Sequence, residues 1–387
     1  MNAMRALVSL GILTTLGATA ALAEDAPAKA PAADLGAVLE AAGVAVGGYL
    51  DVSYSHRTGD GVFASGAPDR VFDTHTDGFS LQQAALSVGF QPKQGFGAFV
   101  NLTLGNDADV IAPYDHYPSR SKFDVTQAYA QYAGSDFTVI AGKFVTLANQ
   151  EFIWSPTDTS FSRSILFGFA IPFTHTGVRA TFTPSDIVTP VVGLNNGWDD
   201  LKDTNTAKTV ELGAIFAPAK ALSVAATGYF GKERVGGLVG FGTEGQRSLV
   251  DVVATWNVTA ALTLVLNYDW GKQANLGEYL SSQAVRGGPN FDARWDGLAG
   301  YLNFTASDDW RLSLRAEVLN DRDGYRTGVV QKWQEVTATV AYLPTKHAEL
   351  RFELRSDRSD APSFSKSNGT EFGRSQQSAA VEALYKL

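Results

Sequence analysis

The chain has 387 residues, with 31 Lys and Arg against 40 Asp and Glu, so its formal net charge is −9. This acidic balance gives no support to nucleic-acid binding, which needs a basic face, and the absence of cysteine excludes disulfides and thiolate zinc sites. The 38 glycines and the 11% share of aromatic residues are typical of many short strands joined by turns.

The N-terminus has the three parts of a secretory signal peptide in the correct order. Met1–Arg5 is basic, Ala6–Ala20 is uncharged and apolar, and Ala21–Ala23 is an A-x-A cleavage site. This order predicts that residues 1–23 are a cleaved signal peptide and that the chain is exported.

Residues 24–44 predict a Pro/Ala-rich linker that leads into a short helix near 34–45. After Ala23, no uncharged apolar run approaches the roughly 18 to 20 residues that a membrane helix needs. The apolar stretch 163–172 is too short and contains glycine and proline. The body of the chain is therefore expected to consist of strands.

Alternation of apolar and polar residues with a period of two recurs along the rest of the chain. In residues 310–318, one face carries Trp310, Leu312, Leu314, Ala316 and Val318, and the other carries Arg311, Ser313, Arg315 and Glu317. Such alternation fits a soluble antiparallel sheet with one face in water. It equally fits a transmembrane barrel with an apolar outer face and a wet lumen.

The lengths of the connections decide between these two folds. Short links (92–95, 134–136, 184–186, 218–220, 259–261, 307–309 and 344–347) alternate with long polar segments (57–77, 105–121, 148–173, 196–207, 232–246, 272–293, 320–329 and 357–374). Short turns at one end and long loops at the other are typical of an outer-membrane barrel, with the turns in the periplasm.

The connections divide the chain into about 16 strands, an even number as bacterial barrels require. We expect strands to begin near Ala45, Phe79, Phe96, Lys122, Phe137, Thr174, Ile187, Lys208, Leu222, Arg247, Leu262, Arg294, Trp310, Val330, Ala348 and Ser375. The predicted fold is all-β, a transmembrane antiparallel β-barrel over residues 45–387, with short periplasmic turns and longer external loops. Aromatic residues at most of the short turns, such as Phe96, Tyr132 and Trp310, predict an interfacial girdle.

Three motifs carry a family resemblance: SRSILFG from Ser162, PFTHTGVR from Pro172, and NNGWDD with DTN in Asn195–Asn205. With them, the chain resembles the OmpL-like β-barrel porin family from its first strand to its C-terminus. The resemblance implies a Gram-negative outer-membrane porin with a signal peptide, one barrel of this size and a diffusion pore, and it implies no catalytic residue. Leu387 departs from the terminal Phe or Trp that is usual in outer-membrane proteins.

Segment 148–173 is the longest and most apolar of the predicted loops. General porins fold the loop after the fifth strand into the channel, so we expect this one to form the constriction. Its apolar residues, Trp154, Phe161, Ile165, Leu166, Phe167 and Phe169, would anchor it, while Glu151, Asp158 and Arg163 would face the pore. The alternative is that the apolar part is an extended sixth strand.

Twelve charged residues are predicted to line the lumen: Lys143, Arg179, Glu211, Asp251, Asp269, Arg311, Arg315, Glu317, Glu335, Arg351, Glu353 and Arg355. The arginines at 311, 315, 351 and 355 are expected to form a basic ladder across two strands. That ladder either attracts anions or pairs with Glu317, Glu335 and Glu353, and the sequence leaves both readings open.

No cofactor or metal is expected, although two loop segments carry clustered carboxylates. The oxygens of Asp199, Asp200, Asp203 and Asn205 resemble calcium ligands, but the EF-hand offsets are missing. Residues 107–116 are similarly rich in Asp and end in a histidine. A polar external loop is the simpler interpretation of each.

The predicted function is passive diffusion of small hydrophilic solutes or ions through an outer-membrane porin, narrowed by loop 148–173. The alternatives are a substrate-selective, anion-preferring channel and a barrel with a structural or adhesive surface role. An enzyme is disfavoured, since no GxSxG motif or spaced triad occurs and His175 lies in a predicted strand. Outer-membrane lipid and a homotrimeric assembly are the expected partners, the trimer by analogy alone.

Overall fold

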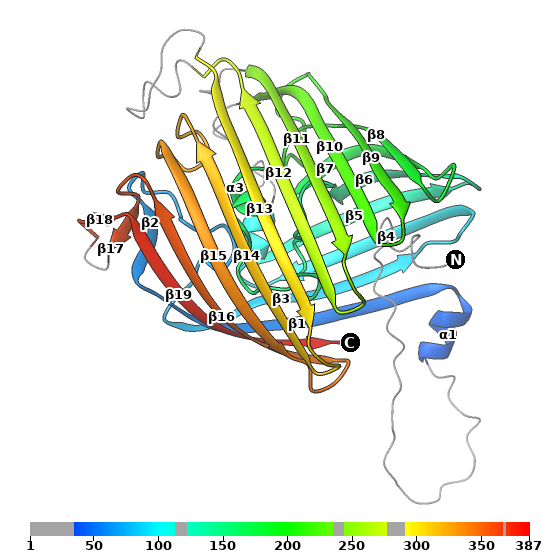
Figure 1. Ribbon diagram of the computed structural model, residues 1–387. Coiled ribbons are helices and arrows are strands. Elements are labelled where there is room, and N and C mark those ends of the chain that lie inside the picture. The colour runs from blue at the N-terminus through cyan, green and yellow to red at the C-terminus, as the bar shows by residue number, and fades with distance from the viewer. Residues whose placement is uncertain (1–34, 113–121, 235–243, 277–290, 367–368) are drawn as a thin grey trace, which may run out of the picture.

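The computed structural model describes residues 35–112, 122–234, 244–276, 291–366 and 369–387. Sixteen antiparallel strands close into one barrel (Figure 1). They are β1 (Val44–Arg57), β3 (Gly78–Phe90), β4 (Gly95–Leu104), β5 (Phe123–Ala133), β6 (Phe137–Val145), β7 (Thr174–Phe182), β8 (Val188–Asn195), β9 (Thr209–Ala219), β10 (Leu222–Arg234), β11 (Glu244–Asn257), β12 (Leu262–Gln273), β13 (Ala293–Thr305), β14 (Trp310–Asp321), β15 (Gln331–Tyr342), β16 (Ala348–Ser359) and β19 (Ser375–Lys386). The predicted fold class is confirmed, and every strand begins close to its predicted residue.

The first and last barrel strands meet along one seam. Strand β1 pairs with β19, with Tyr54 opposite Val381, and on its other side with β3. The remaining strands pair with their neighbours in chain order. Closure gives each of the sixteen strands a hydrogen-bonded neighbour on both sides, so the barrel has no edge strand.

Alternation sorts the side chains of each strand onto two faces. On β12, Leu266 is 57% exposed on the outer face, while the adjacent Asn267 is buried on the inner face. On β16, Leu354 is exposed and Arg355 is buried in the same way. The barrel is therefore apolar outside and polar inside, the reverse of a water-soluble protein.

Aromatic side chains pack in pairs on the outer face beside the short turns. The rings of Phe96 and Tyr132 lie with centroids 4.9 Å apart, and those of Trp310 and Tyr342 lie 4.8 Å apart. All four are at least partly exposed. Their position agrees with the predicted girdle, where amphipathic rings are stable at a membrane interface.

A short helix precedes the barrel, as predicted. Helix α1 (Leu35–Ala41) lies outside the barrel beside the start of β1 (Figure 1). The predicted signal peptide and linker lie outside the described residues, so both stay predictions. In the described part of the chain, no helix is long and apolar enough to span a bilayer.

Four long segments contain secondary structure of their own. Strands β2 (Gly59–Phe63), β17 (Phe364–Lys366) and β18 (Phe372–Gly373) form a small sheet at the loop end of the barrel, beside β16 and β19 in Figure 1. Helix α2 (Ala108–Ile111) follows β4. The 3-10 helix η2 (Ser155–Thr157) and helix α3 (Ile165–Phe169) belong to the segment between β6 and β7.

Candidate channel constriction

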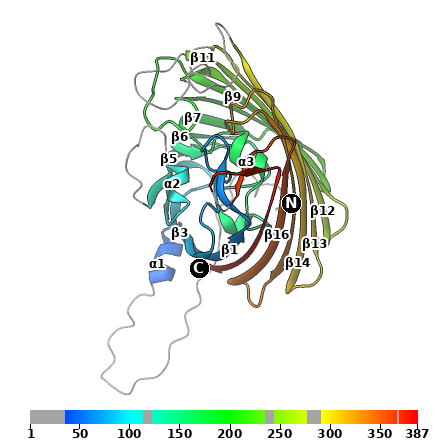
Figure 2. The same ribbon diagram turned by 90° about the vertical axis from the view of Figure 1, so that its left-hand side faces the viewer.

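The segment between β6 and β7 enters the barrel, and α3 lies within the ring of strands (Figure 2). Residues Ile165, Leu166 and Phe167 are nearly inaccessible to solvent. Ser164 caps α3, because its hydroxyl accepts a hydrogen bond from the Phe167 N–H at 3.0 Å. The prediction that loop 148–173 folds into the barrel is confirmed.

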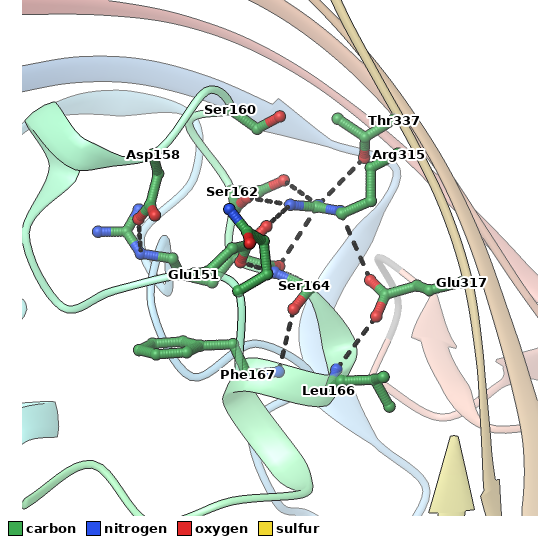
Figure 3. A network of polar contacts seen from close by, with 12 residues as sticks. Glu151, Asp158, Ser160, Ser162, Ser164, Leu166, Phe167, Arg315, Glu317 and Thr337 are labelled. Atoms are coloured by element: carbon green, nitrogen blue, oxygen red, sulfur yellow. Dashed lines mark hydrogen bonds and ion pairs between the residues drawn. The ribbon is translucent and has the colours of Figure 1, made fainter. Parts of the chain in front are cut away.

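Arg315 on β14 connects the wall to the loop (Figure 3). Its Nη1 donates to Oε1 of Glu151 and to the Ser162 carbonyl, both at 2.7 Å, and its Nε donates to Oε2 of Glu335 on β15 at 3.0 Å. The side chain is 1% exposed. A planar guanidinium with five donors can hold a carboxylate and backbone carbonyls together in this way.

Two wall carboxylates bind backbone N–H groups of the loop. Glu317 accepts from Ile165 and Leu166 at 2.7 and 3.1 Å, at the start of α3 (Figure 3). Glu353 accepts from Phe161 and Ser162 at 2.7 and 3.1 Å. The first N–H groups of a helix and those of an extended loop lack the partners that regular structure would provide. Here the two carboxylates satisfy them through charge-assisted hydrogen bonds.

Arg351 and Arg355 on β16 complete the wall side of the anchor. Arg351 donates to the carbonyls of Ser155 and Asp158 at 3.1 and 2.7 Å, and pairs with Glu382 at 2.9 Å. Arg355 donates to the Arg163 carbonyl at 2.7 Å and pairs with Asp357 at 2.9 Å.

The register confirms that the four arginines lie in two cross-strand rows. Arg311 and Arg351 both face Ala341 of β15, and Arg315 and Arg355 both face Thr337. The pairing interpretation is the one the contacts match, because each guanidinium lies against a carboxylate. Arg311 differs from the others in that its side chain is 24% exposed.

An apolar cluster fixes the other end of the loop. Phe167 packs 5.7 Å from Phe72, and Phe169 packs 5.4 Å from Trp333 of β15. Phe63 joins them at 5.9 Å from Phe169. Thus the cluster combines three distant parts of the chain inside the barrel.

The contribution of the first long segment, 57–77, was not predicted. Besides Phe63 and Phe72, it provides Arg70, which pairs with Asp357 of β16 at 2.8 Å, and Asp69, which pairs with Arg57 at 2.6 Å. The two phenylalanines in an otherwise polar loop were the signal in the sequence, since exposed aromatic residues in such a loop have no favourable partner.

Eleven of the twelve predicted pore-lining residues follow the alternation onto the inner face. The twelfth, Lys143, follows a break in the alternation at Gly142, whose φ is +140°. Lys143 Nζ lies 3.0 Å from both carboxylate oxygens of Asp124. All the others except Arg311 are buried as well. Contact of these residues with a passing solute stays a prediction.

The charged residues of the loop point differently from what we expected. Glu151, Asp158 and Arg163 are buried against the wall and one another, with Arg163 Nε 3.0 Å from an Asp158 oxygen. Burial raises the pKa of Asp158 to about 7, although Arg163 opposes the shift. The physical reason is that these groups have fixed partners in the loop and wall. Trp154 remains half-exposed, and Phe167 is buried.

The candidate metal segments already use their oxygens for protein donors. Asp199 accepts from the N–H groups of Phe173 and Thr174, both at 2.8 Å, and Asp200 accepts from Thr204 at 3.0 Å. Among the residues placed by the structure, no three His, Asp or Glu side chains are grouped as a metal site. The end of segment 107–116 lies outside the described residues.

Residues 43–387 match the model of the family described as "Putative beta-barrel porin-2, OmpL-like". No curated protein matches the chain at a significant level.

Several solved porin structures share the fold at low sequence identity. The anion-selective porin from Comamonas acidovorans is 11% identical with a TM-score of 0.60, over 89% of this chain and 99% of that one. The outer membrane channel DcaP of Acinetobacter baumannii is 13% identical with a TM-score of 0.58, over 89% and 97%. OmpT of Vibrio cholerae, in a trimer form, is 11% identical with a TM-score of 0.56, over 89% and 99%. Identities this low show the fold alone.

Proposed function

The chain belongs to the OmpL-like β-barrel porin family and forms an outer-membrane channel. From this premise, we propose that small hydrophilic solutes diffuse passively through the channel, past loop 148–173. The observation that carries this proposal is the anchor of the loop. Arg315, Glu317, Glu353 and Arg351 hold it inside the barrel through bonds to both its backbone and its side chains. A loop held this way narrows a sixteen-stranded lumen that is otherwise wide enough for water.

We further propose that the channel has weak selectivity between anions and cations. The arginine ladder would attract anions only if its guanidinium groups were open to the lumen, but Arg315, Arg351 and Arg355 are buried in ion pairs. The alternative, an anion-preferring channel, would depend on Arg311, whose side chain is partly exposed. The absence of catalysis is part of this proposal, and the burial of His175 against Tyr229, with ring centroids 4.5 Å apart, supports it.

Export, lipid contact and assembly belong to the same proposal. Residues 1–23 would direct export and be removed, and the exposed apolar outer face, with Leu266 and Leu354, would contact outer-membrane lipid. A homotrimer is proposed because the similar Vibrio cholerae OmpT has a trimer form.

Planar-bilayer recording of the purified protein tests the proposed function. We expect stable ohmic steps in KCl, with a nearly symmetric permeability for the two ions. Deletion of residues 158–170 should raise the single-channel conductance, because it removes the part of the loop that Arg351, Arg355 and Glu317 hold.

Heat-modifiable migration in gel electrophoresis serves as the control that both proteins are folded barrels. A folded wild-type barrel without conductance would refute the diffusion function. Equal conductance of a folded deletion variant and the wild type would refute the role of the loop.

A further inference from the structure

Four aromatic side chains face the interior and are half-exposed, in contrast to the buried charges around them. They are Phe152 and Trp154 of the loop, and Phe99 of β4 and Tyr129 of β5 on the wall. We propose that these four rings, the aromatic strip, bind neutral sugar rings during passage. This inference rests on the proposed diffusion function and adds the class of solute to it.

The loop half of the aromatic strip is held in place by its backbone. Residues 151, 153 and 155 are buried, whereas Phe152 and Trp154 between them are half-exposed. Arg163 Nε donates to the Phe152 carbonyl at 2.8 Å, and Thr157 Oγ1 donates to the Trp154 carbonyl at 2.6 Å. The two rings are stacked at 20° with centroids 6.4 Å apart.

The wall half of the strip consists of two directly opposite residues on neighbouring strands. Phe99 faces Tyr129 in the register, and their rings are stacked at 30° with centroids 5.5 Å apart. Glycine flanks the pair on both sides. A Cβ at Gly89 would lie 2.8 Å from Phe99 Cδ2, and a Cβ at Gly142 would lie 2.8 Å from the Cα of Tyr129.

One hydrogen bond brings the two halves together. Trp154 Nε1 donates to Asn101 Oδ1 at 3.0 Å. Asn101 and Phe99 point to the same face of β4 and are two residues apart, which is about 7 Å along a strand. The loop rings and the wall rings therefore border the same part of the lumen, near the middle of β4.

The polar groups beside the strip are neutral amides and hydroxyls. Gln91 Nε2 donates to the Tyr129 hydroxyl at 3.2 Å and to Gln131 Oε1 at 3.0 Å, and the side chain of Gln131 is half-buried on the inner face. The charges on the nearby wall are paired, with Arg179 Nη2 2.8 Å from Glu211 Oε1.

This combination matches the chemistry of a sugar. A pyranose ring has C–H faces that pack on aromatic faces and hydroxyls at its edge that bond to amides. A small hydrated inorganic ion gains neither contact. An organic cation could also lie over aromatic faces, so the experiment must separate the two ligands.

The test is titration of single wild-type channels in KCl with maltotriose. We expect current block that rises with concentration. The Trp154→Ala and Tyr129→Ala variants should each need about 3 to 10 times more maltotriose for half-maximal block, as expected for the loss of one aromatic contact. Trp310→Ala is the matched control, since Trp310 lies on the outer face, and should block like the wild type.

The outcomes distinguish failure of the sugar-binding inference from failure of the proposed diffusion function. Absence of KCl conductance would refute the diffusion function itself. Normal conductance without block by maltotriose, or block that is equal in the wild type and in Trp154→Ala, would overturn the inference and leave the function intact. Block by tetraethylammonium but not by maltotriose would likewise overturn it, in favour of organic cations. Trp154→Phe, which keeps a ring, should retain most of the block and thereby excludes a purely structural effect.

Discussion

The two sides of the barrel interior are built differently. On the anchoring side, strands β14, β15, β16 and β19 present charged residues that are buried, paired and bonded to the loop, as Arg315 and Arg351 are. On the side of β4 and β5, the aromatic strip and neutral amides remain partly open. The charges on the anchoring side thus position the loop, whereas the partly open side chains of the aromatic strip are uncharged.

This difference has a general physical meaning. A charge in a wet lumen costs little, because water solvates it. Once a loop excludes that water, each charge must find partners, and Arg315 has a carboxylate from the loop and another from the wall. We therefore expect the number of charges on the inner face of this barrel to be a poor guide to its ion selectivity.

The largest expected effect is on the anchoring side. Arg315→Ala would leave Glu151, Glu317 and Glu335 buried without their shared cation. We expect the free energy of unfolding to fall by about 3 to 5 kcal/mol, the usual cost of removing one partner from a buried ion pair. Urea unfolding of the folded barrel, followed by tryptophan fluorescence, measures it.

The matched control for Arg315→Ala is Arg322→Ala. Arg322 pairs with Asp296 at 2.7 Å, but its side chain is 61% exposed, so its loss should change the unfolding free energy by about 0 to 1 kcal/mol. If both variants unfold alike, the anchoring side does not differ energetically from the surface.

The second effect concerns the glycine beside the aromatic strip. Gly89→Ala would place its Cβ 2.8 Å from Phe99 Cδ2 and force the ring to move. We expect a loss of about 1 to 3 kcal/mol in unfolding free energy, together with weaker block by maltotriose. Gly78→Ala is the control, because a Cβ there meets no atom within 4 Å. Normal block in Gly89→Ala would show that the position of Phe99 is unimportant.

A smaller effect is expected on ion selectivity. Arg311→Ala should shift the reversal potential in a KCl gradient more than Arg351→Ala does, because only the Arg311 side chain is partly exposed. A shift of equal size in the two variants would show that buried, paired arginines still act on passing ions. It would also favour the anion-preferring alternative.

The last prediction is a dependence of stability on pH. Burial raises the pKa of Asp158 from 3.8 to about 7, so the folded loop holds a proton more tightly than the unfolded chain does. The stabilisation is therefore complete below about pH 4 and is lost as the pH rises through 7. The urea midpoint of the wild type should fall between pH 5 and pH 8. Asp158→Asn should reduce this fall, and an unchanged fall would assign it to other groups.

Most of the barrel could be predicted from the sequence, because alternation and turn spacing are local properties. The strands from Phe79 to Ser375 begin near their predicted residues, and the apolar content of 148–173 correctly indicated a loop that folds inward. The direction of Glu151 and Arg163 could not be predicted. It depends on partners such as Arg315 and on carbonyls within the loop, and these are set by tertiary packing.

The aromatic strip escaped prediction for a related reason. Phe99 and Tyr129 looked like ordinary strand residues, and a bulge in the pairing of β4 with β5 obscured their face. Trp154 was recognised as a loop residue but was expected to act as an anchor. Its proximity to Asn101 appears only when the loop and the wall are placed together.

The anchor of the loop also sets an order of events during assembly. Ile165 binds Glu317, which is 152 residues later in the chain, and the Ser155 carbonyl binds Arg351, 196 residues later. Contacts of such separation form late in folding, after the entropy of closing a long loop has been lost. Until β14 and β16 are in place, the loop lacks these partners, so a fully anchored constriction marks a barrel whose last strands have already been assembled.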